Sequence, residues 1–370
     1  MMVHYWWFLL HMTALGLLCV TQQLQDEEYD CITYVTFINC SGRGITTVGD
    51  WIPPTTEHLD LSRNSLTEIH AGSIRSLWNL KVLLLNDNNI STLADGTFSS
   101  MQSLQRLDLS HNRISKLSSS FSLGLGSLKE LLMGGNKLIT LESRSFLHLE
   151  NLRRLDLSAN TILSIHVFAF GGLTALRRLH LQGNQLESLG SGVFSTLRSL
   201  EVLDLQGNLI NTTDGGVFTP LTSLAMLNLA HNRLSSIRFR TLLSIPSYST
   251  HILLGGNLWH CDCDLQRVFR KLHSVHRLFL DDYNTLNCAE PPELHGSRLE
   301  EVDAQLCVAE TVTVLIITVT VVITVVAAIV MAEKNKARRA DKFWSEENYG
   351  LEGYWCPNVS LKVVLTMITS

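Results

Sequence analysis

Charged residues are scarce in this chain, because Asp, Glu, Lys and Arg make up only 17% of its 370 residues. Soluble proteins contain about a quarter of such residues, so part of the sequence is expected to lie in lipid. The chain also lacks a basic excess, since its formal net charge is −5. Domains that bind nucleic acid carry a basic patch or stripe, and we therefore expect no nucleic-acid partner.

Cysteine is absent from residues 41–260, although the chain has eight cysteines in all. The six that flank this segment are Cys31 and Cys40, then Cys261, Cys263, Cys288 and Cys307. Cysteine clusters on both sides of a long array favour disulfide bonds in an oxidising compartment over a cytosolic metal site.

Two hydrophobic runs set the expected topology. The first lies in residues 1–21, which predict a signal peptide, with an uncleaved anchor as the alternative. Residues 311–332 are uncharged and would span about 33 Å as a helix, enough to cross a membrane. Basic residues follow this span at 334–342 and acidic residues precede it, so the positive-inside rule predicts a cytoplasmic tail, residues 333–370. We expect a single-pass type I plasma-membrane protein with an extracellular N-terminus.

The central segment repeats the pattern L-x-x-L-x-L-x-x-N-x-L, for example from Leu104 to Ile114. Its asparagines are spaced by 24 residues: Asn64, Asn88, Asn112, Asn136, Asn160, Asn184, Asn208 and Asn232. Asn257 follows one residue late, as part of a degenerate final unit. Self-similarity at one fixed period is the signature of a solenoid.

These repeats resemble the leucine-rich-repeat family. The resemblance implies an α/β solenoid, a right-handed horseshoe with a parallel β-sheet on its concave face, formed by residues 56–254. Each L-x-L alternation predicts a short strand with one buried face, and the asparagine side chain is expected to bond the turn backbone. A phenylalanine ten residues after most of the asparagines predicts a convex core with irregular segments rather than long helices.

Residues 22–55 and 255–308 resemble the family's N-terminal and C-terminal caps. The N-terminal cap usually has four cysteines, of which only two are present here. The resemblance implies the disulfide bonds Cys31–Cys40, Cys261–Cys288 and Cys263–Cys307, although the sequence alone leaves three pairings open in the second cap. A zinc site including His273 and His276, spaced as on one helix face, is a weaker alternative; we expect no metal.

Charged side chains recur at the strand positions that should face the concave side. The residue between the two strand leucines forms one column, which includes Asp108, Asp156, Asp204 and His180; two residues upstream lie Arg106, Arg154 and Arg178. One hypothesis is a ligand-binding surface on repeats two to six. The alternative is that these charges pair with one another across the strands.

The sequence contains three N-glycosylation sequons outside the predicted span and tail, at Asn39, Asn89 and Asn211. No catalytic constellation, phosphate-binding loop or metal-ligand set stands out, so we expect no enzyme activity, no cofactor and no small-molecule substrate.

The predicted function is a cell-surface protein whose concave face binds an extracellular or membrane protein, and which signals only through partners because its tail is short. The alternative is an accessory subunit that modulates a channel or receptor in the same membrane. A stripe of small residues, Thr320, Thr324 and Ala328, slightly favours the alternative. Replacement of residues 311–332 would distinguish the two functions.

Overall fold

The computed structural model of the chain describes residues 30–118, 120–302 and 304–346. It contains two compact units, Met1–Val302 and Asp303–Ser370. The predicted signal peptide and the end of the predicted tail lie outside the described residues.

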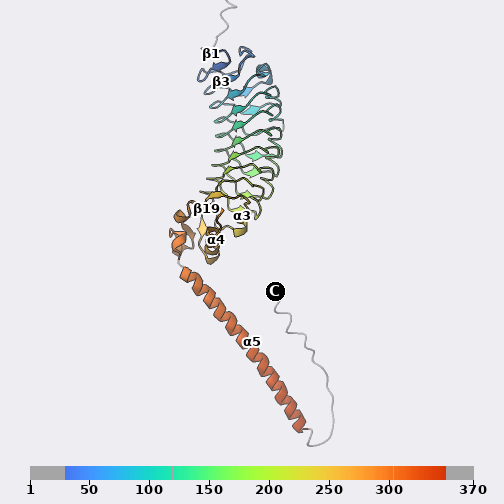
Figure 1. The fold of residues 1–370 in the computed structure, drawn as a ribbon, viewed down its shortest axis with the longest axis vertical. Helices are drawn as coiled ribbons and strands as arrows, with labels where there is room; N and C mark the ends of the chain where they lie inside the picture. Colours follow the sequence, from blue (N-terminus) through green and yellow to red (C-terminus); the bar gives the residue numbers. More distant parts are fainter. Residues whose placement is uncertain (1–29, 119, 303, 347–370) are drawn as a thin grey trace, which may run out of the picture. The chain divides into compact units, whose positions relative to one another are not determined.

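The first unit is a parallel-sheet solenoid of about ten turns. In its described part, short strands on one side of each turn form a twelve-stranded sheet (Figure 1). All neighbouring pairs are parallel except the first, in which β1 (Ile32–Tyr34) pairs antiparallel with β2 (Phe37–Asn39). The strands that follow are β3 (His58–Asp60), β5 (Val82–Leu84), β7 (Arg106–Asp108), β8 (Glu130–Leu132), β10 (Arg154–Asp156), β12 (Arg178–His180), β14 (Val202–Asp204), β16 (Met226–Asn228), β17 (Thr250–Leu253) and β19 (Leu278–Leu280). The predicted solenoid with a parallel sheet is therefore confirmed.

The strands form where the sequence alternates, and in the twelve-stranded sheet every strand from β2 to β16 buries its middle residue. Leu107, Leu131 and Leu155 have no exposed surface, and each lies opposite its neighbour in the sheet register. Full burial of one leucine contributes about 1.5–3 kcal/mol relative to an exposed side chain. Since each turn contacts only its neighbours, this gain is repeated along the stack.

The repeated asparagines are buried and join consecutive turns. Asn136 accepts a hydrogen bond from Ile114 N at 3.0 Å and donates to Leu109 O at 2.9 Å, both in the preceding turn. It also donates to Met133 O in its own turn at 3.1 Å. Backbone N–H and C=O groups beyond the end of a strand have no partner in the sheet, and the asparagine side chains form hydrogen bonds with them.

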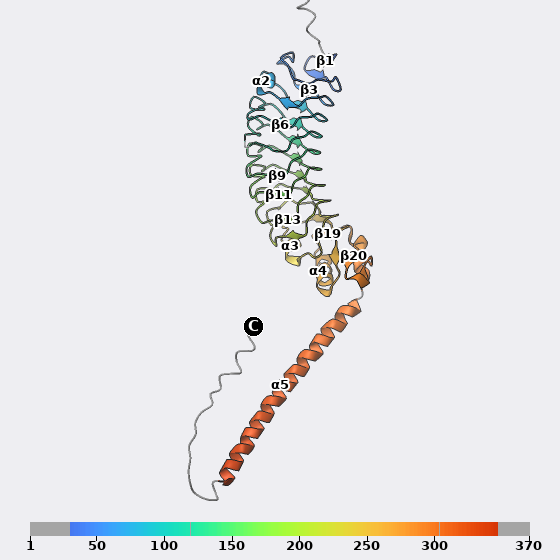
Figure 2. The same cartoon turned by 180° about the vertical axis from the view of Figure 1, so that it is seen from behind.

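The other side of the repeats is covered by turns and by three small parallel sheets (Figure 2), and a fourth lies in the C-terminal cap. These sheets are β4 (Glu68–Ile69) with β6 (Thr92–Leu93), β9 (Thr140–Leu141) with β11 (Ser164–Ile165), β13 (Ser188–Leu189) with β15 (Thr212–Thr213), and β18 (Trp259–His260) with β20 (Cys288–Glu290). Beneath them the phenylalanines stack, with ring centroids 6.2 Å apart for Phe146 and Phe170 and 6.3 Å apart for Phe170 and Phe194. Within the repeats that the structure describes, the helices are α2 (Ala71–Ile74) and α3 (Phe239–Leu243), and neither exceeds five residues.

The longer α4 (Cys263–His273) lies in the C-terminal cap with three short 3-10 helices, η1 (Tyr283–Thr285), η2 (Pro292–Leu294) and η3 (Leu299–Glu301). Asp262 starts α4 by accepting a hydrogen bond from Leu265 N at 2.7 Å. Phe269 of α4 packs against Trp259; both side chains are fully buried, with ring centroids 5.5 Å apart. They close the end of the hydrophobic core.

The second unit contains α5 (Ala304–Glu346), which extends beyond both ends of the expected span. Among the described residues it is the one helix long and apolar enough to cross a membrane, with a candidate span at Val312–Arg339 and a mean hydropathy of 3.0. Thr320 and Thr324 donate their hydroxyl groups to the carbonyls of Ile317 and Val321, each at 2.8 Å. The polar groups of the small-residue stripe are thus satisfied within the helix.

Candidate ligand-binding face

The concave face of the solenoid presents two columns of side chains, one on each side of the buried leucines. The first residues of consecutive strands are adjacent in the register: Arg106, Glu130, Arg154 and Arg178. The third residues form the second column: Asp108, Leu132, Asp156, His180 and Asp204. The structure therefore brings all seven predicted ligand-face residues onto one face, over β7 to β14.

Ion pairs neutralise part of the first column. Arg106 lies 3.4 Å from the Glu130 carboxylate and 4.0 Å from that of Asp108, and Arg154 lies 3.8 Å from Asp156. Arg178 makes no ion pair with any described residue, and its side chain is exposed. The Arg106–Glu130 pair is exposed on both sides and contributes only about 0–1 kcal/mol, so a ligand can replace it at little cost.

The aspartates of the second column hold the turn that follows each strand. Asp108 accepts hydrogen bonds from Ser110 N at 3.0 Å and Ser110 Oγ at 2.5 Å. Asp156 does the same with Ser158, at 3.0 and 2.6 Å, and Asp204 accepts from Gln206 N at 3.1 Å. An aspartate that bonds the backbone two residues ahead stabilises a turn. The aspartates thus have a structural role, which favours the arginines and His180 as ligand contacts.

His180 is half-buried between Asp156 and Asp204 in the register. The pKa of His180 lies below its ordinary value of 6.5, because desolvation by burial and the charges of Arg154 and Arg178 together outweigh the opposing attraction of the two aspartates. The side chain is therefore neutral at pH 7 and offers one donor and one acceptor to a ligand. Burial likewise lowers the pKa of His58, at the start of β3.

Two further residues of this face were not singled out from the sequence. Glu130 occupies the arginine column and pairs with Arg106, which a reading of every first strand position would have found. Gln182, two residues after His180, has a buried Oε1 atom without a hydrogen-bond partner among the described residues. The repeats do not single out Gln182, because the same position holds Ser, Gly, Asn or Ala in other turns and Gln again in the next turn, at Gln206.

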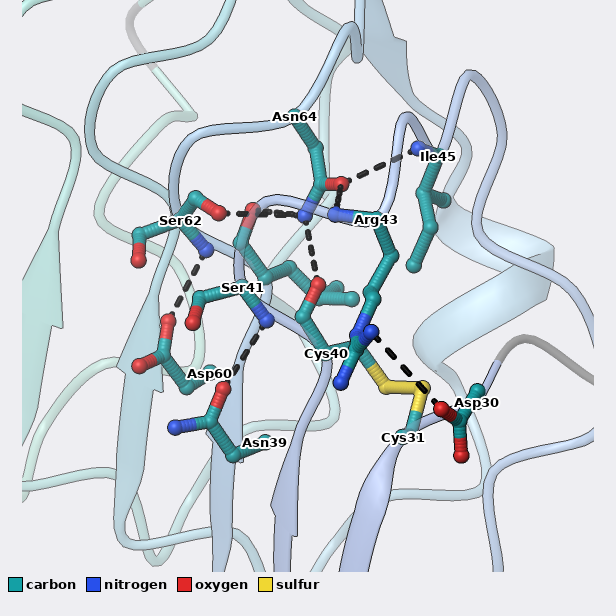
Figure 3. The surroundings of a disulfide bond; sticks show 11 residues. Asp30, Cys31, Asn39, Cys40, Ser41, Arg43, Ile45, Asp60, Ser62 and Asn64 are labelled. Carbon is teal, nitrogen blue, oxygen red and sulfur yellow. Dashed lines mark hydrogen bonds and ion pairs between the residues drawn. A yellow bond between two sulfur atoms is a disulfide. The ribbon is translucent and has the colours of Figure 1, made fainter.

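The N-terminal cap supplies the last hydrogen bonds of the asparagine ladder (Figure 3). Cys40 forms a disulfide bond with Cys31 and is fully buried, and its N–H donates to Asp60 O at 2.8 Å. Asn64 donates to Cys40 O at 2.9 Å and accepts from Ile45 N at 3.0 Å. The turn at Cys40 therefore takes the place of a preceding repeat, and the single disulfide bond fixes it to β1.

In the C-terminal cap a disulfide bond joins Cys261 and Cys288. Cys263 is also disulfide-bonded, and the side chain of its predicted partner, Cys307, is not among those described. His276 lies beyond the end of α4, so the helical spacing that suggested a zinc pair with His273 was wrong.

The predicted glycosylation sites differ in exposure. Asn211 is exposed just before β15, whereas Asn89 and Asn39 are half-buried. The Asn39 Oδ1 atom accepts a hydrogen bond from Ser41 N at 2.9 Å, next to the Cys31–Cys40 bond.

The comparisons with known proteins agree with the fold. Residues 54–114, 78–138, 102–162, 126–186 and 174–234 match the family described as "Leucine rich repeat". The chain is a leucine-rich-repeat protein. Such solenoids are typically non-enzymatic scaffolds for protein–protein interaction.

Among individual relatives, 74 residues are 32% identical to amphoterin-induced protein 3 of Rattus norvegicus, covering 20% of this chain and 15% of that protein. A second match, to decorin of Canis lupus familiaris, is 30% identical over 77 residues, which is 21% of each protein. The chain thus matches about a fifth or less of the length of these relatives. A crystal structure of human 5T4 (Wnt-activated inhibitory factor 1, trophoblast glycoprotein) superposes with a TM-score of 0.55 at 25% identity, covering 74% of this chain and 96% of that one.

Proposed function

We propose that this protein is a type I plasma-membrane protein whose concave face, over β7 to β14, binds another extracellular or membrane protein. Arg154, Arg178 and His180 are the central contacts of this face. The observation that carries the proposal is that Arg178 is exposed without an ion-pair partner among the described residues, beside the half-buried and neutral His180. An unpaired guanidinium beside a partly desolvated polar group suits a protein ligand that supplies a carboxylate.

The test is photo-crosslinking on intact cells. A photoreactive amino acid replaces Val202, which lies opposite Arg178 in the sheet register, so that Arg178 itself is kept; the control places it at Thr219, which is exposed. We expect a discrete adduct from position 202, none from position 219, and at least a threefold loss of the adduct when Arg154→Glu is added. Equal labelling from both positions, or no effect of R154E, would contradict the proposal.

The accessory-subunit alternative requires that α5 bind a neighbouring helix. The hydrogen bonds of Thr320 and Thr324 within α5 remove one reason for such pairing, since satisfied hydroxyl groups need no interhelical partner. Exchange of residues 311–332 for an unrelated apolar helix should therefore leave the adduct at position 202 unchanged. Loss of the adduct would favour the accessory subunit instead.

A further inference from the structure

A second surface, outside the two concave columns, lies along the edge of the sheet where the chain enters each strand. The residues that directly precede the strands stack there through consecutive backbone hydrogen bonds of 2.8–2.9 Å. In order they are Lys81, Gln105, Lys129, Arg153 and Arg177. With about 4.8 Å between neighbouring strands, this edge column is about 19 Å long and carries four cations.

A groove of 420 Å³ runs along the edge column and is lined by Lys81, Lys129 and Arg153. Its other lining residues are serine, glutamine and asparagine, so no acidic, aromatic or large apolar side chain lines it. The Lys129 ammonium donates to Gln105 Oε1 at 2.9 Å, which holds its charge over the groove. The groove therefore offers cations and neutral hydrogen-bonding groups alone.

Carboxylates neutralise only the two ends of the column. Lys81 lies 2.8 Å from Glu57 and Arg177 lies 3.2 Å from Glu201. Neither Lys129 nor Arg153, in the middle, makes an ion pair with a described residue, and both are exposed. The uncompensated charge is thus concentrated at the centre of a linear groove, where it attracts an extended anion.

From this geometry we infer that the edge groove binds a sulfated polysaccharide chain, a ligand class distinct from the protein ligand of the concave face. Sulfate groups suit lysine ammonium and arginine guanidinium groups, and sugar hydroxyl groups suit the serine and amide side chains. An acidic peptide fits less well, because protein ligands derive most of their binding energy from buried aromatic and apolar anchors, for which this groove has no counterpart.

The test measures binding of the detergent-solubilised full chain to immobilised heparin at 0.15 M NaCl. The groove variant is the double reversal Lys129→Glu with Arg153→Glu. Its matched control is Arg113→Glu with Lys137→Glu, an equally charged and exposed Lys–Arg pair on adjacent turns, where the chain has left the strands. We expect at least a tenfold weaker affinity for the groove variant and less than a twofold change for the control. The affinity should also fall with rising salt, because salt screens these exposed charges.

Two outcomes would overturn the inference. Equal losses in both double variants would mean that heparin senses only the general field of the protein. Poly-glutamate that binds as tightly as heparin, or that displaces heparin at matched charge, would show that the groove does not select saccharides. Desulfated heparin that binds as well as heparin would show that the groove does not select sulfate groups.

Discussion

At the scale of single residues, one position explains much of how the turns are built. The residue before each ladder asparagine has a positive φ in all nine turns, between 50° and 69°. Glycine accepts this conformation without cost, and it occupies four of the nine positions. Elsewhere the chain places Arg63, Asp87, His111, Ala159 and His231 there. Because the residue types differ, the sequence period reveals the asparagine ladder but not the left-handed residue beside it.

Ala159, with φ of 50°, should be a site of stored backbone strain. A left-handed L-residue costs about 1–2 kcal/mol, so Ala159→Gly should raise the unfolding free energy by about 1 kcal/mol. Ala225→Gly is the control, since Ala225 is also exposed but has no positive φ; it should lower stability by about 0.5–1 kcal/mol. Thermal unfolding of the full chain measures both, and destabilisation by A159G would refute the role assigned to this position.

His180 should make stability depend on pH. Its folded pKa is lowered by desolvation, so the native state favours the neutral form, and this contribution is complete above the unfolded value of about 6.5. It is lost as the pH falls below 6.5 towards the folded pKa. The melting temperature of the His180→Gln variant should therefore fall less than that of the wild type between pH 7 and pH 5. Identical pH slopes in the two proteins would show that His180 is not desolvated.

At the scale of elements, the asparagine ladder couples each turn to the one before it. Asn136→Ala leaves the buried Ile114 N–H without its acceptor, whereas the Leu109 C=O keeps its hydrogen bond from Asn112. One unsatisfied buried donor costs about 1–3 kcal/mol, and we expect a loss of stability of that size. Hydrogen exchange should show the Ile114 amide exposed first, because neighbouring turns share the interface. The control is Asn79→Ala, an exposed asparagine with one 3.4 Å bond to Pro54 O, which should change stability by less than about 0.5 kcal/mol.

The same scale shows how far the sequence predicts the structure. The 24-residue period placed the concave strands, the ladder and the stacked phenylalanines, because burial repeats at those positions. It did not predict a gap among the small strands opposite the main sheet. Strand β6 of the second repeat and β9 of the fourth have no counterpart after Asn112 in the described part of the third repeat. There Ser120 bonds Asp95 at 2.6 Å instead. Nor did the period by itself reveal that Asp108 and Asp156 hold turns, although Asp-Leu-Ser recurs at 60–62, 108–110 and 156–158, because the same aspartates also suit charge pairing across the strands.

At the scale of the whole molecule, the proposed topology rests on the charge asymmetry around α5 and is tested by glycosylation. The chain has a sequon at Asn211, which is exposed, and another at Asn358 in the predicted tail. Only sequons on the extracellular side receive a glycan. A type I orientation therefore predicts that Asn211→Gln removes one glycosidase-sensitive step in electrophoretic mobility, whereas Asn358→Gln removes none. Asn39→Gln should also remove none, because the Asn39 amide oxygen is bonded to Ser41 N beside a disulfide bond. The reverse pattern, with Asn358 modified and Asn211 bare, would place the repeats in the cytoplasm and contradict both proposed binding surfaces.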